Sequence, residues 1–307
     1  MGTSSNPSRL TIVSRPMSFD QATALIPAGN NSFAGTIQPG WDTPRGPLGG
    51  YVMAILMRGL ELAVADAGRT ARSVTAHFLR APSAGPVSVS ATVERQGRSL
   101  STVSGRLSQD GKLIALALAA YSVPWDGPLL DEAPMPEVEP PDEARRPNPS
   151  MAERQQTADG ESESVARRGR GSSDEFPRPD PPPFTERLSM QHRFGDPPWS
   201  GSDHAETGGW LGLLERRPLD ALAIAVLADA WFPAPWPRLF ELAPAPTIDL
   251  TIHFRTALPL PDSLLLGRFR SPLIRDGFFN EDGELWLPDG TLIAQSRQLG
   301  LLLGAKA

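Results

Sequence analysis

The chain has 307 residues, a formal net charge of −6 and no cysteine. A nucleic-acid-binding protein would carry a basic stripe, so this acidic balance argues against a nucleic-acid partner. The absence of cysteine excludes disulfides, thiolate catalysis and thiolate metal sites.

We expect neither a targeting segment nor a membrane-spanning segment in this chain. Its amino terminus lacks an apolar core of signal-peptide length, and the apolar run Leu113 to Tyr121 is too short to cross a bilayer. The Met1-Gly2 start is only a weak match to a myristoylation site. We therefore expect a soluble cytoplasmic protein with no membrane partner, long enough for two domains of ordinary size.

The first half of the sequence predicts one helix followed by a run of strands. A strand at 32–39 leads through an irregular loop to Gly49-Gly50, and apolar residues at helical spacing predict a helix from Tyr51 to about Ala65. Alternating and β-branched segments then predict antiparallel strands starting at Ser73 and spanning 87–95, 99–107 and 112–123. One helix with such a sheet makes an α+β domain, here residues 1–124.

Residues 125–183 differ from the rest in composition. They are rich in proline and in mixed charges and hold few aromatic residues. Such a segment cannot bury enough apolar surface to offset its ordering entropy, so we expect a linker that is largely disordered in the middle. Its ends can still pack as extended proline-rich arms.

Ordered patterns return in residues 184–307, which form the predicted second domain. Strands are expected at 207–214, 247–256, 264–269, 272–279 and 292–303, and a helix at 221–231. Two short motifs recur in the same order in both halves, and we call them the repeat landmarks. His77-Phe78-Leu79-Arg80 corresponds to His253-Phe254-Arg255, and 110–115 (DGKLIA) corresponds to 289–294 (DGTLIA). The spacing between the landmarks differs by only three residues, which indicates a duplicated unit.

The second-half helix carries one polar residue in an otherwise apolar run. From Ala221 to Trp231 nearly every side chain is apolar, so this helix is expected to be wrapped by its fold. Asp229 lies near its C-terminal end, where the helix dipole disfavours negative charge. An unpaired buried carboxylate is costly, so Asp229 needs a hydrogen-bond partner, a position at the water-exposed rim, or a chemical task.

The sequence resembles the acyl-CoA thioesterase II family and its thioesterase-like relatives. The resemblance is carried by the segments 47–52 (PLGGYV), 73–80 (SVTAHFLR), 227–229 (LAD), 247–249 (TID) and 298–300 (QLG). It covers both folded halves and implies a tandem hotdog fold, in which each half wraps an antiparallel sheet around a central helix. It also implies that Asp229, Thr247 and Gln298 bind the attacking water. A shift in the alignment would select Gln295 instead of Gln298.

Gly49-Gly50 offers a second component of such a site. Backbone amides at Gly49, Gly50 and Tyr51 would project from the positive end of a helix, and glycines let a thioester carbonyl approach closely. The alternative is a tight turn without chemistry. Because the first half has this turn without a carboxylate and the second half has the reverse, we expect one site between the halves.

Three functions are compatible with these residues. The leading one is hydrolysis of acyl-CoA to a free acid and coenzyme A, without a cofactor. A hotdog hydratase or dehydratase acting on enoyl or 3-hydroxyacyl thioesters usually needs an Asp/His pair at the helix, and neither His77 nor His253 lies on one. The third is a non-catalytic acyl-thioester binding protein. No His-x-x-x-His or similar ligand cluster predicts a metal, and exposed sheet edges predict a homo-oligomer, such as a dimer of double hotdogs.

Overall fold

The computed structural model describes residues 17–142, 144–147 and 180–304. The strands of the first half are β1 (Ile26–Gly29), β2 (Ser32–Ile37), β3 (Asp42–Thr43), β4 (Gly46–Pro47), β5 (Thr70–Phe78), β6 (Gly85–Gln96), β7 (Leu100–Gln109) and β8 (Lys112–Ser122). Those of the second half are β9 (Leu188–Gly195), β10 (Glu206–Leu213), β11 (Thr247–Phe254), β12 (Leu265–Arg270), β13 (Ile274–Arg275), β14 (Phe278–Trp286) and β15 (Leu292–Leu301). The helices are α1 (Phe19–Ala22), α2 (Gly49–Val64) and α4 (Ala221–Leu227), with 3-10 turns η1 (Pro183–Arg187) and η2 (Trp236–Arg238).

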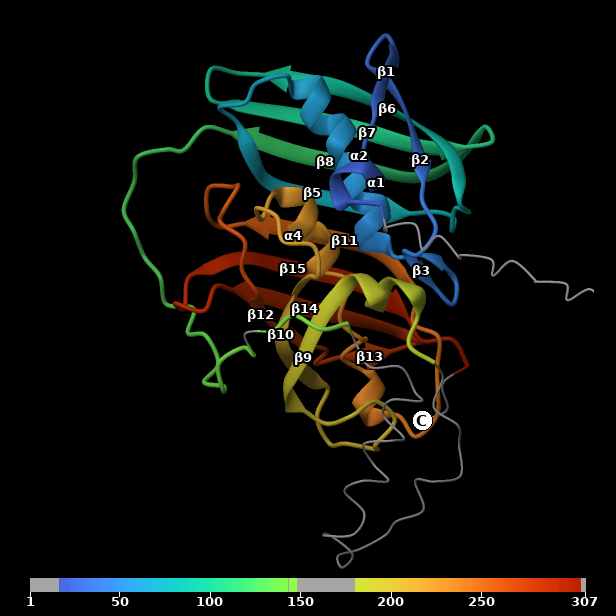
Figure 1. The fold of residues 1–307 in the computed structure, drawn as a ribbon, viewed down its shortest axis with the longest axis vertical. Helices are drawn as coiled ribbons and strands as arrows, with labels where there is room; N and C mark the ends of the chain where they lie inside the picture. Colours follow the sequence, from blue (N-terminus) through green and yellow to red (C-terminus); the bar gives the residue numbers. More distant parts are fainter. Residues whose placement is uncertain (1–16, 143, 148–179, 305–307) are drawn as a thin grey trace, which may run out of the picture.

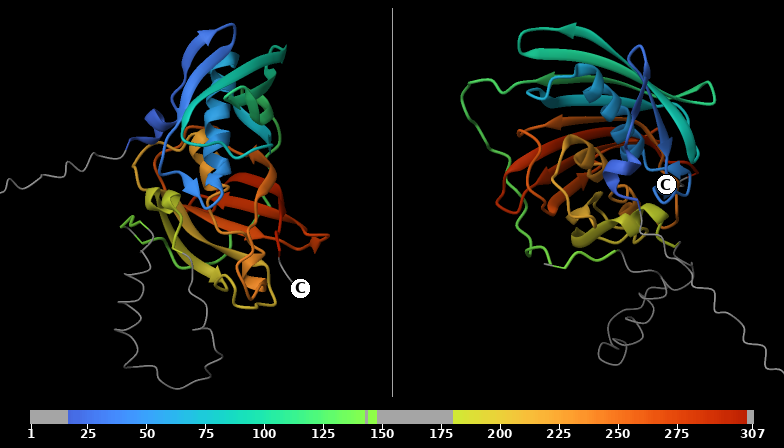
Figure 2. Two further views of the ribbon diagram at one scale, coloured as in Figure 1. Left: turned by 90° about the vertical axis from the view of Figure 1, so that its right-hand side faces the viewer. Right: turned by 45° about the horizontal axis from the view of Figure 1, so that its top comes forward.

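A single antiparallel sheet runs through both halves, as Figure 1 shows. Its strand order is β1-β2-β6-β7-β8-β5-β11-β15-β14-β12-β10-β9, with β13 paired to β14 and a separate β3–β4 hairpin. Figure 2 shows α2 inside the curve of the first-half strands. The tandem hotdog prediction is confirmed.

The two halves join where β5 pairs with β11. In this pairing Thr75 lies opposite Thr251, and their hydroxyl oxygens are 2.9 Å apart. Each threonine stands two residues before the histidine of its repeat landmark. Equivalent residues of the two halves therefore meet at the seam, as a local twofold relationship between the repeats requires.

The two central helices pack against each other at a point that only glycine permits. A Cβ on Gly50 would lie 2.5 Å from the carbonyl oxygen of Ala225 and 2.9 Å from the Cα of Val226. The backbone at Gly50 is an ordinary helical one, so the requirement is close approach and not an unusual dihedral angle. The sequence pattern of α2 fits this packing, because most of its side chains are buried.

The structure corrects two predicted elements of the second half. The helix predicted to reach Trp231 ends at Leu227, because the chain tightens there and the Asp229 amide donates to the Val226 carbonyl. The strand predicted at 272–279 is replaced by the short β13 and by β14, which runs on to Trp286. Apolar residues continue past position 227 because Ala228, Ala230 and Trp231 are buried in the core without being helical.

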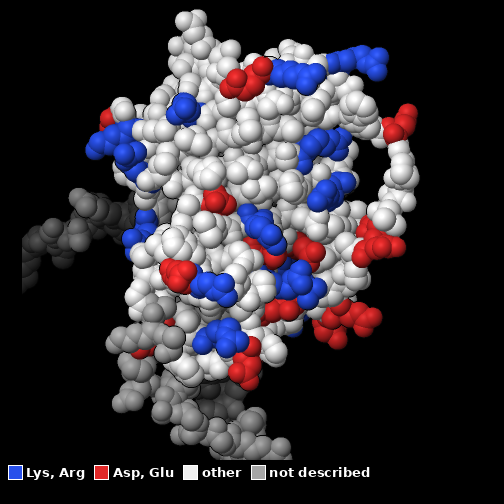
Figure 3. Space-filling model, turned by 180° about the vertical axis from the view of Figure 1, so that it is seen from behind, with Lys and Arg blue, Asp and Glu red and all other residues white. Residues whose placement is uncertain are grey.

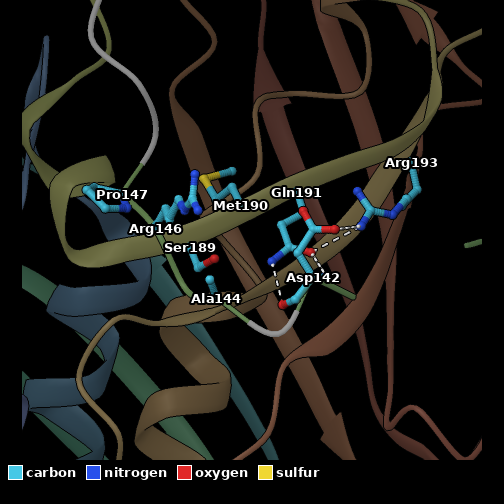
Figure 4. Close-up of a pocket in the computed structure, with 8 residues that line it drawn as sticks. All are labelled: Asp142, Ala144, Arg146, Pro147, Ser189, Met190, Gln191 and Arg193. Carbon is cyan, nitrogen blue, oxygen red and sulfur yellow. Dashed lines mark hydrogen bonds and ion pairs between the residues drawn. The ribbon is translucent and has the colours of Figure 1, made fainter. Parts of the chain in front are cut away.

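The N-terminal end of the predicted linker packs on the second half as an extended arm. Met135 and Val138 contact a cluster that includes Trp210 and Trp286, and the Trp210 indole donates to the Glu139 carbonyl at 2.8 Å. Figure 4 shows the hollow between this arm and β9, where the Asp142 amide donates to Gln191 Oε1 at 2.8 Å. The predicted disordered middle falls mainly on residues 148–179, which lie outside the described residues. The described elements of the first half end at Ser122 and those of the second begin at Pro183, and the boundaries at 125 and 183 stay predictions.

Charges of both signs intermingle on the face of the molecule drawn in Figure 3. Neighbouring strands of the second half exchange ion pairs, such as Arg297 Nε to Asp282 Oδ1 at 2.6 Å and Arg268 Nε to Glu206 Oε1 at 2.7 Å. Within the described residues, no helix is long and apolar enough to cross a membrane.

Substituting Gly50 tests the close packing of α2 on α4. Gly50→Ala should lower the free energy of unfolding by about 2 kcal/mol or more, because the added methyl group meets backbone atoms that cannot move aside. Gly127→Ala is the control, since a Cβ there meets nothing within 4 Å. Urea unfolding of both variants measures the difference. Equal stabilities would contradict the packing described.

Candidate functional site

Asp229 lies where the two halves meet, just beyond the end of α4. Its Oδ2 accepts a hydrogen bond from the Gly50 amide at 2.6 Å, so a carboxylate of the second half bonds the first turn of the helix of the first half. A Cβ on Gly49 would lie 3.0 Å from the same oxygen, so both glycines give Asp229 its room. Asp229 is partly buried as a residue.

This contact explains how a carboxylate is tolerated at the C-terminal end of an apolar helix. The first amides of a helix need acceptors, and the residue before α2, Leu48, has no side chain that can supply one. Asp229 supplies it from 179 residues away in the sequence. The carboxylate therefore faces the positive end of α2, which stabilises negative charge.

The environment of Asp229 makes it a weaker acid than an ordinary aspartate. Burial raises its pKa to about 7, and the hydrogen bond from the Gly50 amide, which favours the charged form, offsets part of this rise. A carboxylate with a pKa near neutrality can accept a proton and release it again at physiological pH.

Thr247 and Gln298 form a direct pair on the inner face of the sheet. Thr247 Oγ1 donates to Gln298 Oε1 at 2.7 Å, and Gln298 is buried. Strict alternation along β11 would place Thr247 on the outer face with Thr251 and His253. A register shift between Thr247 and Asp249 reverses this alternation, so Thr247 joins the side that faces Gln298.

The structure adds a residue that the sequence did not single out, Glu281 on β14. Gln298 Nε2 donates to Glu281 Oε1 at 2.6 Å, and the Ala234 amide donates to Glu281 Oε2 at 2.5 Å. Burial raises the pKa of Glu281 to about 7, these two hydrogen bonds counter the rise, and the negative charge of Asp229 adds to it. Glu281 therefore lies close enough to Asp229 for their charges to interact.

A signal for Glu281 was present in the sequence but fell outside the predicted strand. Alternate residues of β14, such as Phe279, Glu281 and Leu285, face the interior. An acidic residue at an inward position is a candidate for a site, but the predicted strand ended at position 279.

The predicted site residues thus gather into two pairs, Gly50 with Asp229 and Thr247 with Gln298. The described residues show no hydrogen bond between the pairs, and Glu281 connects them through its bond to Gln298 and its charge interaction with Asp229. Gln295 is elsewhere: its Oε1 accepts from Arg255 Nε at 2.9 Å on the exposed side.

The three predicted amide donors, at Gly49, Gly50 and Tyr51, differ in their hydrogen bonds. The Gly50 amide holds Asp229, and the Tyr51 amide donates to the Leu48 carbonyl at 3.1 Å. The Tyr51 side chain is fully buried, and its hydroxyl accepts from Gln38 N and donates to Ala22 O. Gly49, the first residue of α2, makes no amide hydrogen bond within the described chain, so its N–H is the donor available to a ligand.

The described residues contain no group of three or more His, Asp or Glu side chains that could hold a metal ion. The geometry offers two carboxylates with raised pKa, of which Glu281 is buried and Asp229 partly buried, together with a hydroxyl–amide pair and the positive end of a helix. Groups of these kinds can serve in acid–base chemistry on a polar substrate.

Comparison with known proteins gives a consistent result. Residues 37–122 match the acyl-CoA thioesterase N-terminal domain and residues 157–302 match the acyl-CoA thioesterase C-terminal domain. No functionally curated protein matches the sequence.

Solved structures show the same fold over nearly the whole chain. A putative thioesterase II from Thermobifida fusca is 29% identical, with a TM-score of 0.70 over 92% of this chain and 97% of that one. A hotdog-fold protein of unknown function from Alicyclobacillus acidocaldarius is 25% identical, with a TM-score of 0.74 over 95% and 99%. An acyl-CoA thioesterase II from Mycobacterium marinum, 18% identical with a TM-score of 0.67 over 93% and 98%, shares the fold. The chain belongs to the acyl-CoA thioesterase family, with its N- and C-terminal hotdog domains joined in one polypeptide.

Proposed function

We propose that the protein hydrolyses acyl-CoA thioesters, with a water molecule held between Asp229 and the Thr247–Gln298 pair. The observation that supports this most is the position of Asp229. It is a carboxylate whose pKa is raised to about 7, it faces the first turn of α2, and it lies within electrostatic reach of Glu281, which bonds Gln298.

The reaction follows from the hydrogen-bond capacities of these groups. Asp229 accepts one hydrogen of the water, and the Thr247 hydroxyl, whose own hydrogen is donated to Gln298, accepts the other. The water oxygen attacks the thioester carbonyl carbon while Asp229 takes its proton. The carbon–sulfur bond then breaks, and the proton held by Asp229 neutralises the departing thiolate, leaving a carboxylic acid and coenzyme A.

The developing oxyanion needs a donor, and the first turn of α2 supplies one. The Gly49 amide has no acceptor within the described chain, so it is free to donate at the positive end of the helix, next to Asp229. The Gly50 amide donates to Asp229. The Tyr51 hydroxyl bonds Gln38 and Ala22, which fixes the first turn of α2 against the preceding segments. Each half of the chain thus contributes one part of a single site.

The sheet ends at β1 and β9, and we propose that the protein is a homo-oligomer in which such an edge is covered. All four residues of β1 are exposed. Light scattering should give at least twice the mass of 33.0 kDa of a single chain. A monomer at micromolar concentration would contradict this part of the proposal.

Replacing Asp229 by asparagine separates its chemical task from its role at the end of α2. The amide oxygen of Asp229→Asn can still accept from Gly50, but the side chain cannot take a proton. The rate of free-thiol release from a panel of acyl-CoAs should fall by about a hundredfold or more, with the fold retained. Asp229→Ala removes the acceptor as well, so it should lose both activity and stability.

Asp249→Asn is the matched control, because Asp249 lies on the outer face of β11, beyond the register shift that turns Thr247 inward. Equal rates for wild type and Asp229→Asn would exclude the assigned mechanism. Acyl-CoA binding without thiol release from wild type would favour the binding protein, and loss of an enoyl thioester without thiol release would favour the hydratase.

The activity should depend on pH in the direction that a carboxylate base requires. Only ionised Asp229 accepts a proton, so kcat/KM should rise with pH and reach half its plateau near pH 7. The free energy of unfolding should depend on pH in the opposite direction to kcat/KM. Because the folded pKa lies above 3.8, the folded protein keeps a proton that the unfolded chain has lost, so stability falls as pH rises from about 4 to 7.

Asp229→Asn should lack this part of both dependences. Initial rates and urea unfolding across pH 4 to 8 measure them. A wild-type rate that is already constant between pH 5 and 8 would contradict a raised pKa at Asp229.

A further inference from the structure

We propose that Glu281 is a positioning residue that sets the direction of the hydrogen bonds at Thr247, so that Thr247 can meet the nucleophilic water only as an acceptor. This inference rests on the proposed thioesterase function and adds to it a residue outside the predicted set of Asp229, Thr247 and Gln298.

Glu281 receives donors at both carboxylate oxygens. The Ala234 amide donates to Oε2 at 2.5 Å and Gln298 Nε2 donates to Oε1 at 2.6 Å. Glu281 is only 4% exposed, and its strand pairs it directly with Gln298 of β15. Above its pKa of about 7 Glu281 is mainly ionised and has no hydrogen to donate, so its neighbours must present their N–H groups to it, as Ala234 and Gln298 do here.

This requirement fixes the Gln298 amide. A glutamine amide has a donating and an accepting end, which can exchange places by a half-turn of the terminal group. With Nε2 directed at Glu281, Oε1 is directed at Thr247, and the Thr247 hydroxyl donates to it at 2.7 Å. The single hydroxyl hydrogen is thereby used, and only lone pairs of Thr247 Oγ1 are left for a further partner.

The direction of these bonds matters for attack on a carbonyl. A water molecule is a nucleophile through its lone pairs, so both of its hydrogens should be held by acceptors. Asp229 is one acceptor, and Thr247 becomes the second only while Gln298 keeps its orientation. A Thr247 hydroxyl that donated to the water would instead engage one of the two lone pairs of the water oxygen and leave one water hydrogen without this acceptor, which makes the oxygen a weaker nucleophile.

A simpler role for Glu281 would be to tie the segment after α4 to the sheet through Ala234. That role needs a single acceptor and does not depend on which way Gln298 points. The two roles therefore differ in what they predict for an amide at position 281.

The test is Glu281→Gln, measured by thiol release from the acyl-CoA that wild type hydrolyses fastest. The new side chain can accept from Ala234 but then presents its NH₂ to Gln298. Gln298 must turn, and its NH₂ then faces Thr247, whose hydroxyl donates outward. We expect kcat to fall about ten- to a hundredfold, with KM within about twofold of wild type.

The exchanged pair Glu281→Gln with Gln298→Glu is the rescue. The amide now at position 281 would accept from Ala234 and donate to the carboxylate now at position 298. That carboxylate would also accept from Thr247, which restores the original direction of the bonds at Ala234 and Thr247. This double variant should recover most of the lost kcat and exceed the single variant Gln298→Glu, in which two carboxylates face each other.

Glu284→Gln is the control for a carboxylate on the same strand. Glu284 lies on β14 and is paired with Arg270 at 3.8 Å, away from Gln298 and Ala234. Its replacement should leave kcat unchanged.

The outcomes separate this inference from the proposed function. If wild type releases no thiol from any acyl-CoA, the proposed thioesterase function is wrong. Turnover by wild type with wild-type kcat in Glu281→Gln would remove only the role of Glu281, as would a double variant no better than either single one. Thermal unfolding of each variant identifies loss of fold. If Glu281→Gln does not fold, the comparison of the double variant with Gln298→Glu decides.

Discussion

The hydrogen bond between the Gly50 amide and the Asp229 carboxylate is the interaction on which the rest of this structure depends. It satisfies the first turn of α2, which has no capping side chain of its own, and it gives the carboxylate of an apolar segment a partner. It exists only because glycine lets α2 approach the end of α4. Burial at the same junction raises the pKa of Asp229 to about 7, and the hydrogen bond from Gly50 offsets part of that rise.

At the opposite end of the helix pair, near the start of α4, the carboxylates have partners of a different kind. There Asp220 caps its own helix by accepting from the Ala223 amide at 2.8 Å, and Arg217 bonds Asp220 at 2.7 Å and Asp20 at 3.0 Å. Arg58 of α2 also approaches Asp20, at 3.5 Å. These carboxylates are neutralised by arginine. In contrast to Asp220 and Asp20, Asp229 and Glu281 have no ion pair within the described residues.

The sequence was sufficient for features that depend on local pattern. The repeated landmarks located the strands that meet at the Thr75–Thr251 seam, and Gly49-Gly50 marked the start of α2. Long-range features were missed. The predicted helix overran to Trp231 because burial without helical structure keeps the same apolar composition. The register shift that turns Thr247 inward cannot be seen in the alternation of polar and apolar residues along β11. Glu281 can be recognised as an inward-facing acidic residue only when the full extent of β14 is known.

In the mechanism we propose, burial at the junction of the halves makes Asp229 a base near neutral pH. A carbon-13 NMR titration of aspartate carboxyl groups, with Asp229→Asn used to assign the resonance, measures this directly in the folded protein. We expect the Asp229 carboxyl to titrate with a midpoint near pH 7. A midpoint near 4, the value of an ordinary solvent-exposed aspartate, would contradict it.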